Sequence, residues 1–160
     1  MKHLPSLRNL AVTAIAASAV AMAIGGVSMA RAGGTSASQH TFTLKEVQTG
    51  SAFVSISHSK AGKPGDGFIF HSKLYNGDGQ KVGSLDVNCT LVLSNQVLCL
   101  GTITLPGGTL TATALVPNNG NAPTHVAIDG GTGRYAHVSG QMTSYTTGQT
   151  TDRDVFELRY

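Results

Sequence analysis

Glu46 is the side chain of this chain with the clearest potential for acid–base chemistry. It follows Phe42 and Leu44 at two-residue intervals, so in a strand it shares a face with two apolar side chains. If that face is the inner one, loss of water raises the pKa of the Glu46 carboxyl, as at many catalytic sites. In the alternative arrangement, the strand presents its polar side at the mouth of a barrel. Both arrangements are open from the sequence.

The other candidate groups do not form a recognisable constellation. The chain contains no G-x-S-x-G, no H-E-x-x-H and no P-loop motif. The histidines beyond the first 32 residues are scattered, and a single histidine predicts no chemistry. They are therefore interpreted as surface polar residues: His40, His58, His71, His125 and His137.

One glycine-rich segment matches a cofactor motif without its context. Residues 131–136, GTGRYA, fit the G-x-G-x-x-[GA] dinucleotide pattern after a strand-like run. The motif needs a helix directly after it, and Ser139, Gly140 and several Thr follow instead. We expect a tight glycine corner here and no cofactor.

The two cysteines, Cys89 and Cys99, are equidistant from Ser94, which with Asn95 and Gln96 is expected to join two strands as a hairpin. Direct pairing of these strands places Cys99 opposite Cys89, on the apolar face. Export into an oxidising compartment then favours a cross-strand disulfide. The alternative is two buried free thiols. No His lies at ligand spacing from either Cys, so no metal site is expected.

The elements that position these residues are predicted to be strands throughout. The chain beyond residue 40 has no sustained helical periodicity and is rich in Thr and Gly. Eight strand-like runs alternate with turn signals, which is typical of a β-sandwich or β-barrel. The runs are 41–48, 52–58, 67–75, 81–93, 96–105, 109–116, 124–129 with 135–147, and 153–160.

Period-two alternation predicts which side chains point inward. A closed sheet buries such one-sided apolar faces without leaving edges, so we expect an all-β, eight-stranded antiparallel barrel. Its interior is either filled by side chains or holds one small ligand. If a ligand binds there, the expected lining residues are Phe68, Phe70, Ser72, Leu74, Leu85, Val87 and Cys89.

The first 32 residues have the layout of a secretory signal peptide. A basic start with Lys2 and Arg8 precedes an apolar run from Leu10 to Val27, and Ala30-Arg31-Ala32 offers a cleavage pattern. The alternative is an uncleaved membrane anchor, although the run is mostly Ala and only weakly hydrophobic. We therefore expect secretion after cleavage near Ala32, no stable membrane insertion afterwards, a flexible lead over 33–40 and one domain over 41–160.

Charge excludes one class of partner. The formal charge of +3 comes entirely from Lys2, Arg8 and Arg31, because the other eight basic residues balance the eight acidic ones. A basic nucleic-acid-binding stripe is therefore not expected.

The chain resembles plant allene oxide cyclases and dirigent proteins over about residues 41–160. The similarity to the cyclases lies in Gly65-Asp66, in residues 70–78 (FHSKLYNGD), in Val82-Gly83 and in residues 89–92 (CTLV). The corner at 127–135 (AIDGGTGRY) followed by Gly140 resembles one shared by both families, and residues 155–160 (VFELRY) resemble their last strand.

This resemblance implies a calycin-like barrel with an apolar cavity, which in these families is often a homotrimer. Allene oxide cyclases hold a fatty-acid epoxide beside a glutamate and a bound water. The family glutamate corresponds to Thr49 here, and the water-holding asparagine corresponds to Ser72, which can still bind a water or a hydroxyl group. Ser72 and Glu46 are therefore the candidate catalytic residues, and the departures speak against allene oxide cyclisation itself.

Three functions fit the sequence. The first is a barrel that binds a small hydrophobic molecule and steers its cyclisation or coupling by confinement, an isomerase-like or stereo-directing activity. The second is a non-catalytic carrier of a lipophilic molecule. The third is a structural extracellular barrel with a filled interior. The first two need the same apolar lining, so the sequence does not separate them.

Overall fold

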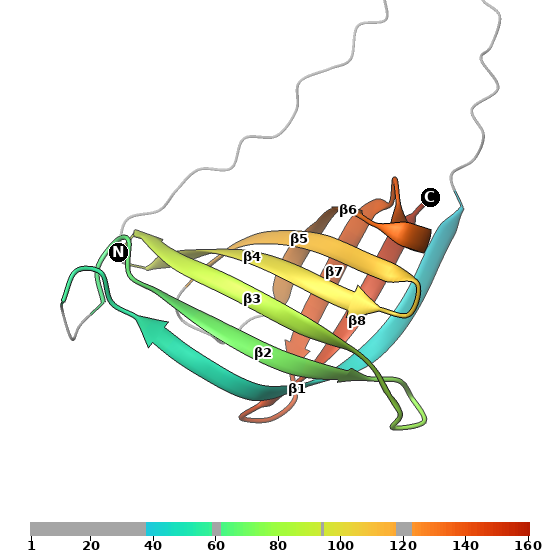
Figure 1. Ribbon diagram of the computed structural model, residues 1–160, viewed down its shortest axis with the longest axis horizontal. Helices are drawn as coiled ribbons and strands as arrows, with labels where there is room; N and C mark the ends of the chain where they lie inside the picture. Colours follow the sequence, from blue (N-terminus) through green and yellow to red (C-terminus); the bar gives the residue numbers. More distant parts are fainter. Residues whose placement is uncertain (1–37, 59–61, 94, 118–122) are drawn as a thin grey trace, which may run out of the picture. The chain divides into compact units, whose positions relative to one another are not determined.

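The computed structural model describes residues 38–58, 62–93, 95–117 and 123–160, and these residues form a closed antiparallel β-barrel (Figure 1). The eight strands follow one another around the barrel in chain order, which confirms the predicted fold class. The predicted signal peptide and most of the predicted lead lie outside the described residues. The strands are β1 (Gln39–Val54), β2 (Gly67–Tyr75), β3 (Lys81–Leu93), β4 (Gln96–Leu105), β5 (Gly108–Pro117), β6 (Thr124–Gly131), β7 (Ser139–Thr146) and β8 (Thr151–Arg159).

Strand β1 closes the barrel by pairing with β8 in its first half and with β2 in its second half. The sequence predicted two strands here, at 41–48 and 52–58, and that division is wrong. Residues 49–51 do not form a turn, because a bulge between Gln48 and Gly50 absorbs one residue and lets β1 continue to Val54. A bulge increases the local bend of a strand, as closure of a barrel requires.

The strands β6 and β7 correspond to the predicted run 124–129 with 135–147, which is therefore two strands and not one. A single 3-10 turn, η1 (Gly133–Tyr135), separates them. This is the predicted glycine corner, and no α-helix follows it. Gly133 has φ +60°, and a Cβ there would lie 2.1 Å from the carbonyl oxygen of Gly107. The backbone approaches too closely for any larger residue.

The hydrophobic core fills the end of the barrel that carries η1. Its members come from every strand, and Phe42 and Phe156 stack across β1 and β8 with their ring centroids 4.6 Å apart. Five side chains of this cluster have no exposed surface: Leu74, Ile103, Leu110, Phe156 and Leu158. The end that carries η1 is thus closed by packed apolar side chains.

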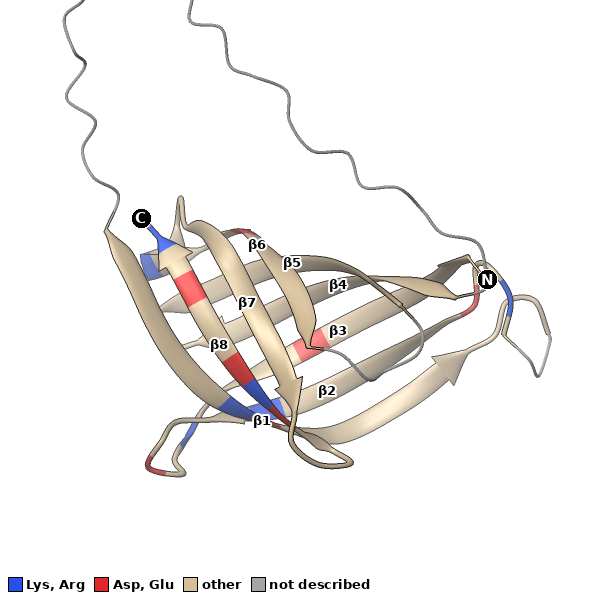
Figure 2. Ribbon diagram, turned by 180° about the vertical axis from the view of Figure 1, so that it is seen from behind, with Lys and Arg blue, Asp and Glu red and all other residues tan. Residues whose placement is uncertain are grey.

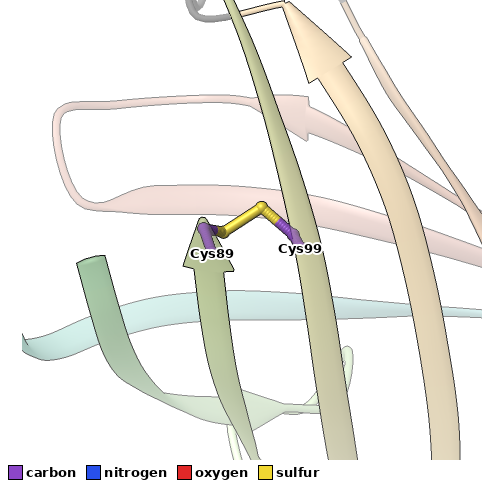
Figure 3. Close-up of a disulfide and its surroundings, with 2 residues drawn as sticks. All are labelled: Cys89 and Cys99. Carbon is purple, nitrogen blue, oxygen red and sulfur yellow. A yellow bond between two sulfur atoms is a disulfide. The ribbon is translucent and has the colours of Figure 1, made fainter. Parts of the chain in front are cut away.

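The disulfide between Cys89 and Cys99 links β3 and β4 near the opposite end (Figure 3). The two residues are direct register partners, as the hairpin argument predicted, so the predicted disulfide is confirmed. Cys89, Leu91 and Val97 form a second, smaller apolar cluster beside it.

The connection from β1 to β2 is held by Asp66, whose side chain has no exposed surface. Its Oδ1 accepts the backbone N–H groups of Ile56 at 2.7 Å and Ser57 at 2.8 Å. Its Oδ2 accepts the Ser57 hydroxyl at 2.5 Å and the Lys63 N–H at 2.9 Å. These hydrogen bonds hold the pKa of Asp66 well below its usual value.

Among the described residues, none belongs to a helix of the length and apolarity needed to cross a membrane.

Candidate functional site: an apolar pocket with an acidic side

A pocket of about 240 Å³ lies inside the barrel, on the side of the core away from η1. Side chains from every strand line it, which is expected where the inner faces of a closed sheet converge. Most of the lining is apolar and comes from β2 to β6. Two acidic side chains, Glu46 from β1 and Asp152 from β8, lie on the remaining side.

Glu46 points into the barrel, so the structure selects the inward arrangement of the two that the sequence left open. The side chain is only 5% exposed. The hydroxyl of Ser72, which is fully buried on β2, donates a hydrogen bond of 2.6 Å to Oε1 of Glu46. The two residues meet because β1 and β2 pair with Gln48 opposite Ser72 and Glu46 opposite Leu74.

Burial raises the pKa of the Glu46 carboxyl. The Ser72 hydrogen bond opposes this shift because it stabilises the carboxylate, whereas the negative charge of Asp152 adds to it. A carboxyl group with a raised pKa exchanges a proton more readily near neutral pH than an exposed glutamate does.

Asp154 is a second buried carboxyl group beside Glu46, and it was not among the residues predicted from the sequence. It is register partner to Leu44 on β1 and Ser144 on β7, and it has no exposed surface. Neither of its carboxyl oxygens has a hydrogen-bond partner among the described residues. Burial raises its pKa to about 8, and the charge of Glu46 contributes to the rise. Strand alternation could have indicated its inward position, because Asp154 precedes the inward-facing Phe156 by two residues.

The two carboxyl groups influence each other's ionisation, so they act as a pair. Because the pKa of Asp154 is raised to about 8, the pair retains a proton at neutral pH, and the hydrogen bond from Ser72 favours the ionised form of Glu46. The pair can therefore give up or take up a proton at one side of the barrel interior.

The predicted lining residues all lie on the inner face of β2 or β3, but not all reach the pocket. Ser72 and Leu74 are fully buried beneath its surface, Ser72 against Glu46 and Leu74 in the core. The remaining five form part of its wall: Phe68, Phe70, Leu85, Val87 and Cys89. The other half of the disulfide, Cys99, also lines the pocket.

None of the histidines in the described part of the chain lines this pocket. His71 lies on the outside of β2, where its Nδ1 is 2.6 Å from Oδ1 of Asp86. Both residues line a larger outer hollow of about 580 Å³ with the exposed Ile69 and Leu100. Thr49 donates a hydrogen bond to the carbonyl oxygen of His71, also on the exterior, and does not replace a catalytic glutamate.

Charged residues are sparse on the barrel. Seen from behind, acidic and basic segments follow one another along β8 beside a basic stretch of β1, further charged segments lie on β3 and in the loops, and most of the ribbon is neutral (Figure 2). Within the described ranges, no group of three or more His, Cys, Asp or Glu side chains is placed to hold a metal ion.

A scan against models of protein families and a search of the curated proteins gave no match. Comparison with solved structures gave several. A pyocyanin demethylase is 29% identical, with a TM-score of 0.64 over 74% of this chain and 99% of its own.

Two further solved structures are below 25% identity and show the shared fold alone. A Diels–Alderase from Streptomyces koyangensis is 19% identical, with a TM-score of 0.62 over 76% of this chain and 63% of its own. A pterocarpan synthase dirigent protein is 21% identical, with a TM-score of 0.56 over 77% of this chain and 95% of its own. The chain thus has the barrel fold of dirigent proteins and cyclase barrels.

Proposed function

We propose that this barrel, whose fold is that of dirigent proteins and cyclases, binds a small hydrophobic molecule in its interior and steers its cyclisation or coupling. The observation that carries the proposal is the composition of the interior pocket. Its walls are largely apolar, and a buried glutamate lies at one side. An apolar pocket with few polar groups is the usual form of a small-molecule site.

The walls of the pocket supply confinement. A flexible molecule held there loses most of its conformations before it reacts, which lowers the entropic part of the barrier. Phe68 and Phe70, with ring centroids 6.3 Å apart, present two neighbouring aromatic surfaces against which the molecule packs. The positions of these two rings select the conformation in which the bound molecule reacts.

Glu46 supplies the acid–base function. Cyclisation is an isomerisation, so no co-substrate is consumed. A proton that Glu46 removes from one atom of the substrate returns to another after ring closure. Ser72 acts as a positioning residue, because it holds Oε1 of Glu46 without itself lining the pocket.

A second candidate function is demethylation of an aromatic compound. It is favoured by the pyocyanin demethylase, which is the most similar in sequence of the structures described above and matches over 99% of its own length. Pyocyanin is therefore the first compound to test as a substrate.

Secretion and trimer formation also belong to this proposal. The disulfide supports an oxidising compartment such as the cell exterior, because cytosolic thiols are kept reduced. Native mass spectrometry of the protein from its own culture medium reports the cleavage site, the oligomeric state and any retained molecule in one spectrum. A co-purified hydrophobic compound would identify the substrate class.

The decisive experiment compares Phe70→Ala with Ile69→Ala. Phe70 lines the pocket, whereas its neighbour Ile69 is 45% exposed on the outer face. With a panel of fatty-acid epoxides, phenols and polyketides, we expect Phe70→Ala to change both ligand affinity and product distribution, and Ile69→Ala to change neither.

Three other results have distinct meanings. If Phe70→Ala changes affinity and no compound is turned over, the barrel is a carrier. If Glu46→Gln leaves turnover intact, Glu46 is not the acid–base group. If no compound of the panel binds the wild-type protein, the interior pocket is not a site for such molecules, the structural role is favoured and the proposal fails.

A further inference from the structure

We propose that the acidic side of the interior pocket binds a positively charged group, so that the ligand of this barrel is a compact hydrophobic organic cation. This inference rests on the proposed function, because it specifies the class of molecule that the pocket accepts. It comes from the arrangement of three carboxyl groups and from the lack of a basic side chain opposite them among the residues that the structure describes.

The three carboxyl groups lie on the inner face where β1 meets β8. Glu46 and Asp152 are direct register partners, and both line the pocket. Asp154 occupies the next inward position of β8, closer to the core, and is fully buried. Acidic groups this close together repel one another, so the cluster costs stability unless something compensates it.

No basic side chain of the described residues lines the pocket. The nearest basic side chains in sequence point the other way. Lys45 and Arg153 are register partners of β1 and β8, and both are exposed on the outer face. Arg153 stacks over the ring of Tyr145 at 4.5 Å. A buried carboxylate usually has a cationic partner, and the described residues do not supply one here.

Asp154 is the second, independent observation. Both of its oxygens lack a hydrogen-bond partner among the described residues, although almost all buried polar groups have one. Asp154 does not itself line the pocket, so a ligand acts on it through its two acidic neighbours that do, Glu46 and Asp152. A positive charge placed against Glu46 and Asp152 compensates the whole cluster.

The remainder of the pocket determines the type of cation. The walls contributed by β3 to β5 are formed by aliphatic side chains, glycine and the disulfide, and a small hydrated ion gains nothing from them. The rings of Phe68 and Phe70 favour a flat or alkylated cation, which gains apolar contact and cation–π attraction.

Proton release is the expected consequence of binding. The groups that interact with Asp154 are Glu46 on β1, Ser144 on β7 and Asp152 on its own strand. Ser72 on β2 is linked to this group by its hydrogen bond to Glu46. None of them is basic. In the free protein the proton on Asp154 reduces the repulsion, and a bound cation takes over that role. Binding of a cation should therefore displace the proton and tighten as the pH rises.

The test compares two probes of nearly the same shape, 1-methylquinolinium and 1-methylnaphthalene. They differ in charge and share the two-ring frame and the methyl group. Binding to the intact protein is measured by isothermal titration calorimetry between pH 6 and pH 9, in buffers of different ionisation enthalpy. These buffers report the number of protons released.

We expect the cation to bind more tightly than the hydrocarbon, to release protons at pH 7 and to gain affinity with pH. If one proton is released, the affinity for the cation should rise by at most about tenfold per pH unit below the pKa of Asp154. Glu46→Gln should lower the affinity for the cation by roughly 30-fold or more, and the affinity for the hydrocarbon by less than about threefold. Asp154→Asn should remove the proton release. The control Asp78→Asn makes a similar change in an exposed turn and should alter neither probe.

If the hydrocarbon binds as tightly as the cation, or if no protons are released, the inference is wrong and the pocket remains a neutral apolar site. If neither probe binds, the inference and the interior-pocket proposal fail together. The wild-type pH profile decides the question even if a variant does not fold.

Discussion

The Ser72 hydroxyl on β2 donates a 2.6 Å hydrogen bond to the carboxylate of Glu46 on β1, and neither side chain is more than 5% exposed. This contact gives Glu46 a fixed orientation at the side of an otherwise apolar pocket. It also joins two candidate residues that the sequence offered on different grounds, Glu46 from strand alternation and Ser72 from the family resemblance.

Ser72→Ala should destabilise the barrel and raise the pKa of Glu46 further. A buried hydrogen bond to a charged group contributes about 1–3 kcal/mol, and its loss leaves the carboxylate with less stabilisation. Chemical denaturation at pH 7 measures the first effect, and the carbon-13 shift of the Glu46 carboxyl against pH measures the second. Ser84→Ala on the neighbouring strand β3 is the control. A lower pKa for Glu46 in Ser72→Ala would contradict the assignment.

Asp154 should make the protein less stable as the pH rises. Its pKa is raised to about 8 in the folded state, so the folded protein binds a proton that the unfolded chain releases near pH 4. Stability therefore falls between about pH 4 and pH 8 by a few kcal/mol from this group. Asp154→Asn should flatten the dependence of Tm on pH and raise Tm at pH 8, and Asp78→Asn should not. Equal slopes in Asp154→Asn and wild type would refute the prediction.

Asp66 should have the opposite pH dependence. Its pKa is lowered in the folded state by hydrogen bonds from Ser57, Lys63 and Ile56, so its contribution is present above the usual pKa of an aspartate and is lost as the pH falls through the lowered value. Asp66→Asn removes an acceptor from this cluster. Hydrogen exchange at pH 7 should be several-fold faster at the amides of Ile56 and Ser57. Unchanged protection there would show that Asp66 does not hold this connection.

Loss of the disulfide should cost stability without changing the fold. The bridge closes a segment with a sequence separation of 10, for which the loss of chain entropy predicts about 2–3 kcal/mol. The double variant Cys89→Ala, Cys99→Ala should unfold at lower denaturant concentration than wild type. A reductant should lower the midpoint of the wild type alone. A midpoint that is insensitive to reductant in both proteins would contradict the prediction.

Gly133→Ala tests the corner before β7. A Cβ at this position lies 2.1 Å from the Gly107 carbonyl oxygen, and the backbone has φ +60°, so we expect a loss of about 1–3 kcal/mol. Gly77→Ala is the matched control, because a Cβ there meets no atom within 4 Å. The comparison is made by thermal unfolding. Equal effects of the two substitutions would mean that the corner tolerates a side chain.

Local information in the sequence was sufficient for much of the fold. Period-two alternation identified the inner faces of β2 and β3, because successive side chains of a strand point to opposite sides. The equal spacing of Cys89 and Cys99 from Ser94 predicted their pairing, since a hairpin is a local structure. The same alternation allowed an inward Glu46 but left its burial open.

Closure of the barrel decided what the sequence could not. The bulge at Gln48 and Gly50 keeps β1 continuous, and β1 thereby pairs with both β2 and β8. Asp154 reaches Glu46 only through that pairing of the first and last strands, although its own spacing from Phe156 already put it on the inner face. Whether an inward carboxyl group meets water, a cation or another acid depends on strands distant in sequence. The acidic side of the pocket is therefore a property of the tertiary structure.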